Sequence, residues 1–382
     1  MNLSIFFAPL RDFPDTYVQD AKAVGNAVST FVHKFPDWRS ADMALIGINE
    51  YRGAGLEPAL LHPADEVRKK FYALKKGTGA YKIADLGNLL PGITLEDTYL
   101  RLKEIVENLV QHQTIPIIIG GSHDLDYGQY LGYENIEKAV NLVTVDACID
   151  MTEGTDIPQH QQHLHRILLH EPNYLFSLSQ VGFQSYFVPS EVTITLDKLY
   201  FETVRVGELH QNIQLAEPVI RHADLLSFDV NAINAQAAPN VNGSNPFGLS
   251  GEQACQICWY AGLNDQLTSF GLYEYHPEKD HLGITAMTLS VMLWYFTEGF
   301  YNRKNETDFK SKKFTKYAIA FHDNPNKMLF YKSKVSDKWW MEVEALGEEK
   351  KIKIVPCSYD DYLLAAKGEV PNRWILTQGR MS

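Results

Sequence analysis

Short apolar runs that alternate with helical patterns are the feature that most restricts how this chain can fold. Seven runs have the length of a strand, at residues 43–48, 81–86, 115–119, 142–145, 175–181, 225–228 and 269–273. Between two of these runs, Leu102, Ile105, Val106 and Leu109 recur at helical spacing. Apolar strands that alternate with helices are typical of a parallel sheet buried on both faces. We therefore predict an α/β fold with three layers, in which helices cover both faces of a mostly parallel sheet.

The ends of several predicted elements can be placed from capping residues and composition. Thr94, with Asp97 three residues later, predicts the start of a helix. Residues 248–263 and 283–301 are predicted to be two further helices. After residue 304 the pattern changes to short strands at 317–321, 328–331, 338–343 and 351–355, followed by a helix at 360–366. We predict a main domain at 1–304, an appended antiparallel β segment at 305–356, and a C-terminal helix and tail at 357–382 that pack on the main domain.

An aromatic pair in the appended segment has two interpretations. Trp339 and Trp340 would cover a neighbouring chain or a pocket if they are exposed, or they would pack within the segment's own small core. The sequence leaves both open.

Charge and cysteine content restrict the partners and the compartment. The formal net charge of the 382 residues is −12, and the basic residues cluster only at 303–316, which argues against a nucleic-acid partner. The four cysteines are too few and too irregularly spaced for a disulfide framework. No signal peptide pattern and no apolar run of about 18 residues is present. We expect a cytoplasmic protein without a membrane partner.

Polar side chains follow three of the predicted strands, where ligands gather in open α/β sheets. The first group is Gly120-Gly121-Ser122-His123-Asp124, the second is Asp146-Ala147-Cys148-Ile149-Asp150, and the third is Ser227-Phe228-Asp229-Val230-Asn231. In an extended chain, Asp146, Cys148 and Asp150 would point to one side and converge on a cation. Taken one at a time, the groups also fit a loop histidine, a helix cap and a turn.

In this order, the three groups resemble the signature motifs of the ureohydrolase family of arginases, agmatinases and formiminoglutamases. Those motifs are Gly-Gly-Asp-His, Asp-Ala-His-x-Asp and Ser-x-Asp-x-Asp. The early loop Arg52-Gly53-Ala54-Gly55, the pair Gly248-Leu249 and the late strand 272–277 resemble other parts of the family pattern. The resemblance spans roughly residues 40 to 300, is closest to formiminoglutamase-like members, and implies an arginase-like fold.

The resemblance implies two manganese sites, of which one is complete. His123, Asp146, Asp150 and Asp229 would form the first site, and Asp146 and Asp229 would also reach the second. The family completes the second site with a His and an Asp, but Cys148 and Asn231 stand at those positions. A thiolate is a soft ligand that suits zinc better than manganese, and an amide oxygen carries no charge. We therefore expect Mn²⁺ in one site and a degraded second site.

The family reaction would be hydrolysis of a C–N bond in a linear guanidino or formimino compound by a metal-activated hydroxide. Glu274 would hold the cationic nitrogens of this small-molecule substrate. His163 or His165 would deliver a proton to the leaving amine, although both also fit surface positions in a polar loop. The resemblance also implies a homo-oligomer.

Two other functions compete with this hypothesis. Cys148 and Asn231 favour a catalytically impaired protein of the same fold that acts in binding or assembly, whereas the retained ligands and Glu274 favour catalysis. A deacetylase-like enzyme with one zinc ion shares the fold, but its Asp-x-His pair is absent here. Cys255 and Cys258 lie in a predicted apolar helix, which favours inert buried thiols over a redox or zinc pair.

Overall fold

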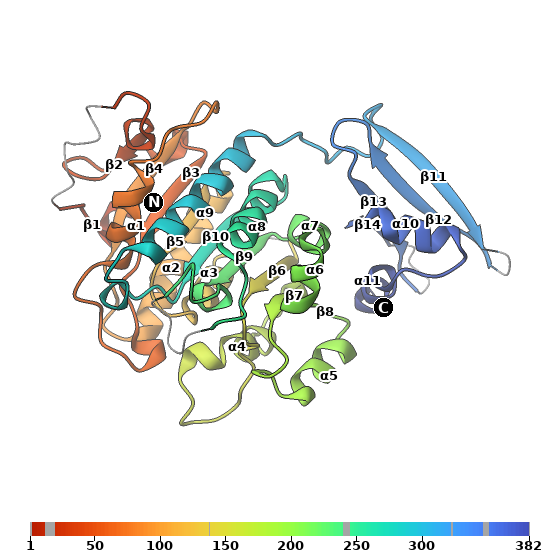
Figure 1. Ribbon diagram of the computed structural model, residues 1–382, viewed down its shortest axis with the longest axis horizontal. Helices are drawn as coiled ribbons and strands as arrows, with labels where there is room; N and C mark the ends of the chain where they lie inside the picture. The colour runs from red at the N-terminus through yellow and green to blue at the C-terminus, as the bar shows by residue number, and fades with distance from the viewer. Residues whose placement is uncertain are drawn as a thin grey trace.

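A large mixed sheet between two layers of helices forms the main body of the molecule (Figure 1). The computed structural model describes residues 2–11, 20–136, 138–239, 245–321, 324–346 and 351–381. The ten strands of the sheet are β1 (Phe7–Ala8), β2 (Val28–Thr30), β3 (Met43–Gly47), β4 (Ile83–Leu89), β5 (Ile115–Ile119), β6 (Val140–Val145), β7 (Leu175–Phe183), β8 (Glu202–Arg205), β9 (Leu225–Asp229) and β10 (Ser269–Tyr273). The predicted three-layer α/β fold is confirmed, and each of the seven predicted strands has a counterpart.

The order of the strands determines which strand ends lie close together. The sheet runs β1-β4-β3-β5-β10-β9-β6-β7-β8, with β2 paired to β4. The pairings are parallel except for β1, which runs antiparallel to β4. The four central strands β5, β10, β9 and β6 are neighbours, although they lie far apart in the sequence. Their carboxyl ends therefore share one edge of the sheet.

Alternating side chains of the buried strands separate two hydrophobic cores. Met43 and Leu45 of β3 face one core, whereas Ala44 and Ile46 face the other. The first core is covered by α1 (Pro63–Phe71), α6 (Val206–Gln211), α7 (Ala216–Arg221), α8 (Gly251–Leu263) and α9 (Ile284–Tyr301). The second is covered by α2 (Leu95–Gln111), α3 (Leu125–Leu131), α4 (His163–Leu168) and α5 (Ser190–Lys198). Within the described residues, no helix combines the length and apolar character needed to cross a membrane.

The starts of helices α2 and α8 can be compared with the predicted ones. Helix α2 begins directly after Thr94, whose hydroxyl accepts the Asp97 N–H while the Asp97 carboxylate accepts the Thr94 N–H, as predicted. Helix α8 begins three residues later than predicted, with Ser250 as its cap. The reason is that the Leu249 N–H donates to the Ala232 carbonyl, which holds this segment beside the loop after β9.

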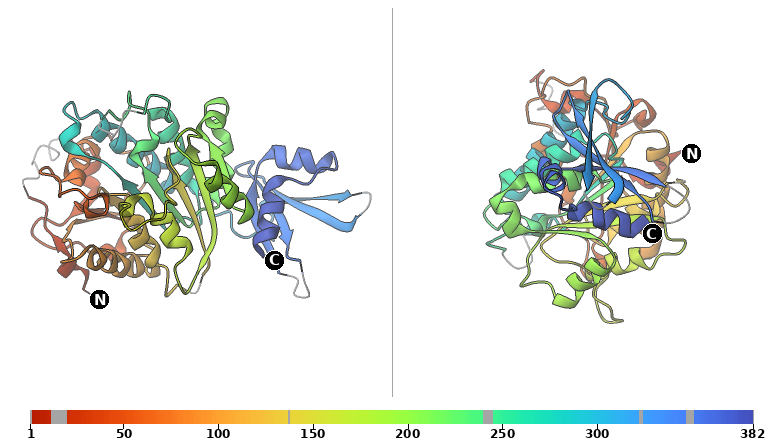
Figure 2. Two further views of the ribbon diagram at one scale, coloured as in Figure 1. Left: turned by 90° about the horizontal axis from the view of Figure 1, so that it is seen from below. Right: turned by 90° about the vertical axis from the view of Figure 1, so that its right-hand side faces the viewer.

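A separate antiparallel sheet follows the main body, as predicted (Figure 2). Its strands are β11 (Phe314–Phe321), β12 (Asn324–Ser333), β13 (Trp339–Glu344) and β14 (Ile352–Cys357), followed by α10 (Tyr359–Ala366) and α11 (Asn372–Met381). Trp339 and Trp340 are only 7% and 4% exposed. The Trp339 ring lies 4.6 Å from that of Tyr362 in α10. The tryptophan pair therefore packs within the molecule and does not form an exposed surface.

Two arginines connect this small sheet to the main domain. Arg221, at the end of α7, lies 4.2 Å from the centre of the Trp340 ring and donates to the carbonyls of Trp339 and Cys357. Arg373 of α11 pairs with Glu202 of β8. Helix α11 also packs on the small sheet, so it contacts both bodies.

Candidate metal centre

Polar side chains from four neighbouring strands meet at the carboxyl edge of the main sheet. His123 follows β5, Asp146 and Asp150 follow β6, Asp229 ends β9, and Glu274 follows β10. The parallel order β5-β10-β9-β6 places these strand ends side by side. Each side chain leaves a buried strand at the point where the strand ends, which is the position where open α/β sheets bind ligands.

The His123 imidazole lies at the centre of three carboxylates. Its Nδ1 atom is 3.2 Å from Asp229 Oδ2, 3.4 Å from Asp146 Oδ2 and 3.6 Å from Asp150 Oδ2. Among the residues that the structure describes, this buried nitrogen has no hydrogen-bond partner. Donor atoms about 2.0–2.2 Å from one cation and at right angles to each other are about 3 Å apart. The four side chains therefore fit one divalent cation.

The charges of the cluster require a positive counterpart. Burial raises the pKa of Asp146 well above its ordinary value, and the charges of Asp229 and Asp150 raise it further. Burial also opposes a charge on His123, but the three carboxylates outweigh this effect and raise the pKa of the imidazole well above its ordinary value. Carboxylates this close to each other are stabilised by a proton or a metal ion.

A sharp turn brings His123 to the carboxylates. Gly120 and Gly121 have φ angles of +96° and +81°, which side-chain-bearing residues rarely adopt. A Cβ at Gly120 would lie 2.6 Å from the Ile48 carbonyl oxygen. The two glycines therefore let the chain turn directly after β5.

Replacing Gly120 by alanine should destabilise the fold. The substitution combines an unfavourable φ with a contact to backbone, so we expect a loss of roughly 1–3 kcal/mol or more in the free energy of unfolding, measured with urea. Gly207→Ala in α6 is the control, because an added Cβ there would meet no described atom within 4 Å. Equal midpoints for Gly120→Ala and the unmodified chain would contradict this account of the turn.

Cys148 and Asn231, the two residues that depart from the family motifs, lie next to the carboxylates of the cluster. Burial and the charges of Asp146, Asp150 and Asp229 raise the pKa of the Cys148 thiol. The Asn231 N–H donates to Asp229 Oδ1 at 2.5 Å, and the buried Asn231 Oδ1 has no hydrogen-bond partner among the described residues. A thiol is a soft ligand, and an amide oxygen carries no charge.

Glu274 is buried beside the His123 loop. It has a φ of +64°, which is rare for a residue with a side chain. One carboxylate oxygen accepts the His123 N–H at 2.9 Å, and the other lies 3.3 Å from His276 Nε2. Burial opposes its charge, but the hydrogen bond with His276 and the nearby His160 lower the pKa of Glu274. Glu274 is therefore an anion fixed next to the centre.

The two histidines predicted to deliver a proton occupy different environments. His163 is 1% exposed, and its ring lies 4.3 Å from that of His123. His165 lies farther out and pairs with the exposed Glu153 at 2.9 Å. His160 is partly exposed, with Nδ1 3.4 Å from the Gly53 carbonyl oxygen. The sequence did not distinguish the enclosed His163 from its neighbours.

Two further polar residues, to which no sequence motif assigned a role, contact the histidines of the centre. Asp126, in α3, accepts hydrogen bonds from His163 Nδ1 at 2.7 Å and from Ser227 Oγ at 3.1 Å. Ser227 Oγ in turn accepts a hydrogen bond from His123 Nε2 at 2.9 Å. Ser227 could have been found from its strand, because it shares a side of β9 with Asp229. Asp126 carried no comparable signal.

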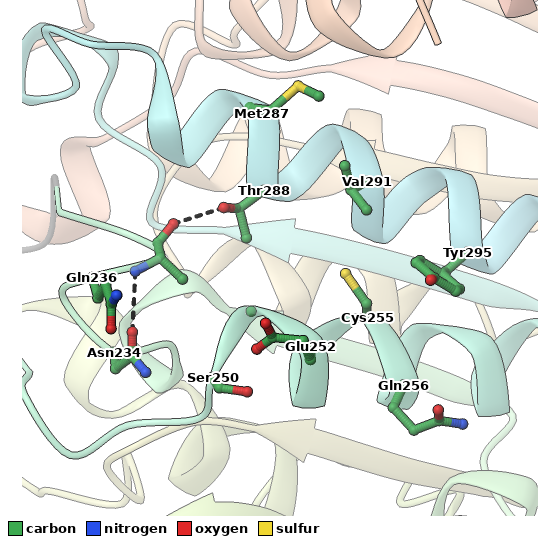
Figure 3. Close-up of a pocket in the computed structure, with 12 residues that line it drawn as sticks. Asn234, Gln236, Ser250, Glu252, Cys255, Gln256, Met287, Thr288, Val291 and Tyr295 are labelled. Atoms are coloured by element: carbon green, nitrogen blue, oxygen red, sulfur yellow. Dashed lines mark hydrogen bonds between the residues drawn. The ribbon is translucent and has the colours of Figure 1, made fainter. Parts of the chain in front are cut away.

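A pocket separate from the metal cluster lies elsewhere on the main domain. It has a volume of about 550 Å³ and lies between α8, α9 and the loop after β9 (Figure 3). In that loop the Ala237 carbonyl accepts the Thr288 hydroxyl at 2.7 Å, and Glu252 and Cys255 of α8 also line the pocket. His123, the three aspartates and Glu274 are not among its lining residues. We place the chemistry at the metal cluster, because donor atoms converge there.

Comparison with known proteins identifies the family. The sequence matches the arginase family over residues 42–297, which is more than half of the chain and includes every residue of the cluster. The chain belongs to the arginase family. The small sheet lies outside the matched region. The family match and the fold support a hydrolase that acts on C–N bonds, which confirms that expectation.

The relatives of this arginase-family chain include formimidoylglutamases. A formimidoylglutamase from Lysinibacillus sphaericus (strain C3-41) is 27% identical over 217 residues, or 54% of this chain and 67% of the relative. The formimidoylglutamase structure from Bacillus subtilis has a TM-score of 0.64 and 16% identity, and the match covers 78% of this chain and 97% of that one. The Trypanosoma cruzi formiminoglutamase, solved with Mn²⁺, has a TM-score of 0.63 and 17% identity, covering 71% and 100%. At these identities, the solved structures establish the fold.

Proposed function

We propose that this protein hydrolyses a C–N bond of a linear formimino or guanidino compound at a centre that holds one divalent cation. The observation that carries the proposal is the buried, unpartnered Nδ1 of His123, which faces three carboxylate oxygens at 3.2–3.6 Å. The formimidoylglutamase names of the relatives favour a formimino compound.

The side chains of the cluster have distinct proposed roles. His123, Asp146, Asp150 and Asp229 would hold the cation, for which we propose Mn²⁺. The bound cation would lower the pKa of a water molecule from about 15.7 towards about 7 and thereby supply a nucleophile at neutral pH. Glu274 would accept hydrogen bonds from the cationic nitrogens of the substrate, because a carboxylate has about four acceptor positions and the structure uses two.

The leaving amine requires a proton when the C–N bond breaks. A donor that works repeatedly must exchange protons with solvent, and His163 is too enclosed for this exchange. His165 and His160 are both partly exposed. We propose His160, because it lies close enough to Glu274 to lower the pKa of that carboxylate.

A homo-oligomer remains a prediction.

A product assay tests the proposed function. The unmodified chain is freed of metal with a chelator, reloaded with Mn²⁺ or Zn²⁺, and given a panel of formimino, guanidino and acetylated-amine compounds. We expect Mn²⁺-dependent release of formamide, ammonia or urea. Zn²⁺-dependent release of acetate would instead support the deacetylase alternative. Retention of a metal without turnover of any compound would support a role in binding or assembly.

Replacing Glu274 by glutamine should weaken substrate use more than metal retention. The substitution keeps the shape but removes the charge that would attract a cationic substrate, so we expect kcat/KM to fall on the order of 100-fold, or about 2.7 kcal/mol. The control is Glu252→Gln in the separate pocket, which should leave kcat/KM unchanged. An equal loss of kcat/KM in Glu274→Gln and Glu252→Gln would contradict our placement of the substrate beside Glu274.

A further inference from the structure

His163 stands beside the proposed cation in a position suited to a ligand. Its Nε2 atom is 3.2 Å from Asp150 Oδ2. His123, Asp150 and His163 offer donor atoms within 4.8 Å of one another. His163 is the first residue of α4 and is 1% exposed, so packing fixes its ring. This second ligand group shares His123 with the group formed by Asp146 and Asp229.

Hydrogen bonds fix which nitrogen of each imidazole keeps its hydrogen when a cation binds. His163 Nδ1 lies 2.7 Å from Asp126 Oδ1, and a carboxylate accepts, so Nδ1 carries a hydrogen. Nε2 is then the nitrogen that would offer a lone pair to a cation, because a histidine ligand gives up its hydrogen at the bound nitrogen. Ser227 donates its hydroxyl hydrogen to Asp126, so it accepts from His123 Nε2. His123 Nδ1 is therefore the nitrogen of that ring that would offer a lone pair to a cation.

One buried carboxylate thus orients both imidazoles. Asp126 is fully buried and acts on His163 directly and on His123 through Ser227. The remaining nitrogens, His123 Nδ1 and His163 Nε2, both face the aspartates. His163 Nε2 and Asp150 Oδ2 lie 3.2 Å apart, a separation at which both could bind one cation. Histidines that bind metals are commonly held by a carboxylate in this way.

We propose that His163 is a fifth protein ligand of the cation held by His123, Asp146, Asp150 and Asp229, and that Asp126 is the positioning residue for both imidazoles. This inference rests on the proposed function. His163 adds an imidazole next to Asp150, whereas Cys148 and Asn231 offer only a thiol and an amide. The centre is then built for one cation with two nitrogen and three carboxylate ligands.

Metal titration of variants tests the inference. We expect His163→Ala to weaken Mn²⁺ binding by about 10–100-fold in calorimetry, and to weaken Co²⁺ binding more, because imidazole favours the later metals of the series. Asp126→Asn keeps both imidazoles and should weaken binding by about 10-fold. The control, His210→Ala, removes an exposed imidazole of α6 and should change neither affinity. Equal Mn²⁺ and Co²⁺ affinities in His163→Ala and the unmodified chain would overturn the inference.

A spectroscopic count of ligands needs no variant that might misfold. Pulsed electron-nuclear resonance on the Mn²⁺-loaded, ¹⁵N-histidine-labelled chain should detect two coordinated imidazoles, and a single one would overturn the inference. If one imidazole is found and His123→Ala abolishes binding, His163 is not a ligand and the proposed function stands. If the unmodified chain binds no divalent cation, the proposed function fails with it.

Discussion

Replacing His123 by alanine is expected to abolish retention of the cation. His123 Nδ1 is the donor that faces all three carboxylates, so its loss removes the ligand common to both candidate groups. Loss of an outer-shell partner alone costs about 10–100-fold in metal affinity, so we expect at least about 100-fold for this ligand. Activity in the product assay should fall in parallel, because the nucleophile depends on the cation.

Thermal unfolding with added Mn²⁺ provides a second readout of the same substitution. A ligand at about 100 times its Kd stabilises a protein by about 2.7 kcal/mol, so the unmodified chain should gain Tm on adding Mn²⁺. His123→Ala should lose most of this gain, while His210→Ala keeps it. A full Mn²⁺-dependent gain in His123→Ala would show that the cation binds elsewhere.

Restoring the second metal position should change the stoichiometry of the centre. Cys148→His combined with Asn231→Asp replaces a neutral thiol and a neutral amide with an imidazole and a carboxylate, which Mn²⁺ prefers. Asp146 and Asp229 already lie next to these positions, because they accept the Cys148 and Asn231 N–H groups at 3.1 and 2.5 Å. We expect elemental analysis to rise from one to two Mn²⁺ per chain.

The two single variants show how much each substitution contributes to binding of the second Mn²⁺. Cys148→His and Asn231→Asp alone should each tighten the second Mn²⁺ less than the pair, because each leaves one neutral donor. We expect the pair to tighten it on the order of 100-fold, or about 2.7 kcal/mol. An unchanged stoichiometry in the double variant would contradict our placement of the second position. Finding two Mn²⁺ ions in the unmodified chain would contradict the prediction that the second site is degraded.

Local sequence patterns determined the layers of the fold. Apolar runs such as 115–119 are strands because each has the length and composition of a strand buried on both faces, and β5 has those bounds. The capping box formed by Thr94 and Asp97 determined the start of α2, because it satisfies backbone N–H groups within one turn of the helix. Such interactions involve residues close together in the chain, so they can be predicted from the sequence alone.

The order of motifs also indicated which strand ends carry the candidate ligands. The alternation of side chains placed Asp146 and Asp150 on one side, and the structure brings both within 3.6 Å of His123. The environment of His163 was not predictable, because its contacts depend on how α3 and α4 pack against the carboxyl edge.

The sequence by itself determined the α/β layers, the appended antiparallel sheet and the strand ends that carry polar side chains. Only the tertiary structure decided that Asp126 orients two histidines, that His163 is enclosed, and that Trp339 and Trp340 are buried. The physical reason is the range of the interactions. The apolar pattern of a strand and the cap of a helix involve residues close in sequence, whereas the Asp126–Ser227 contact joins side chains 101 positions apart and exists only after the sheet has formed.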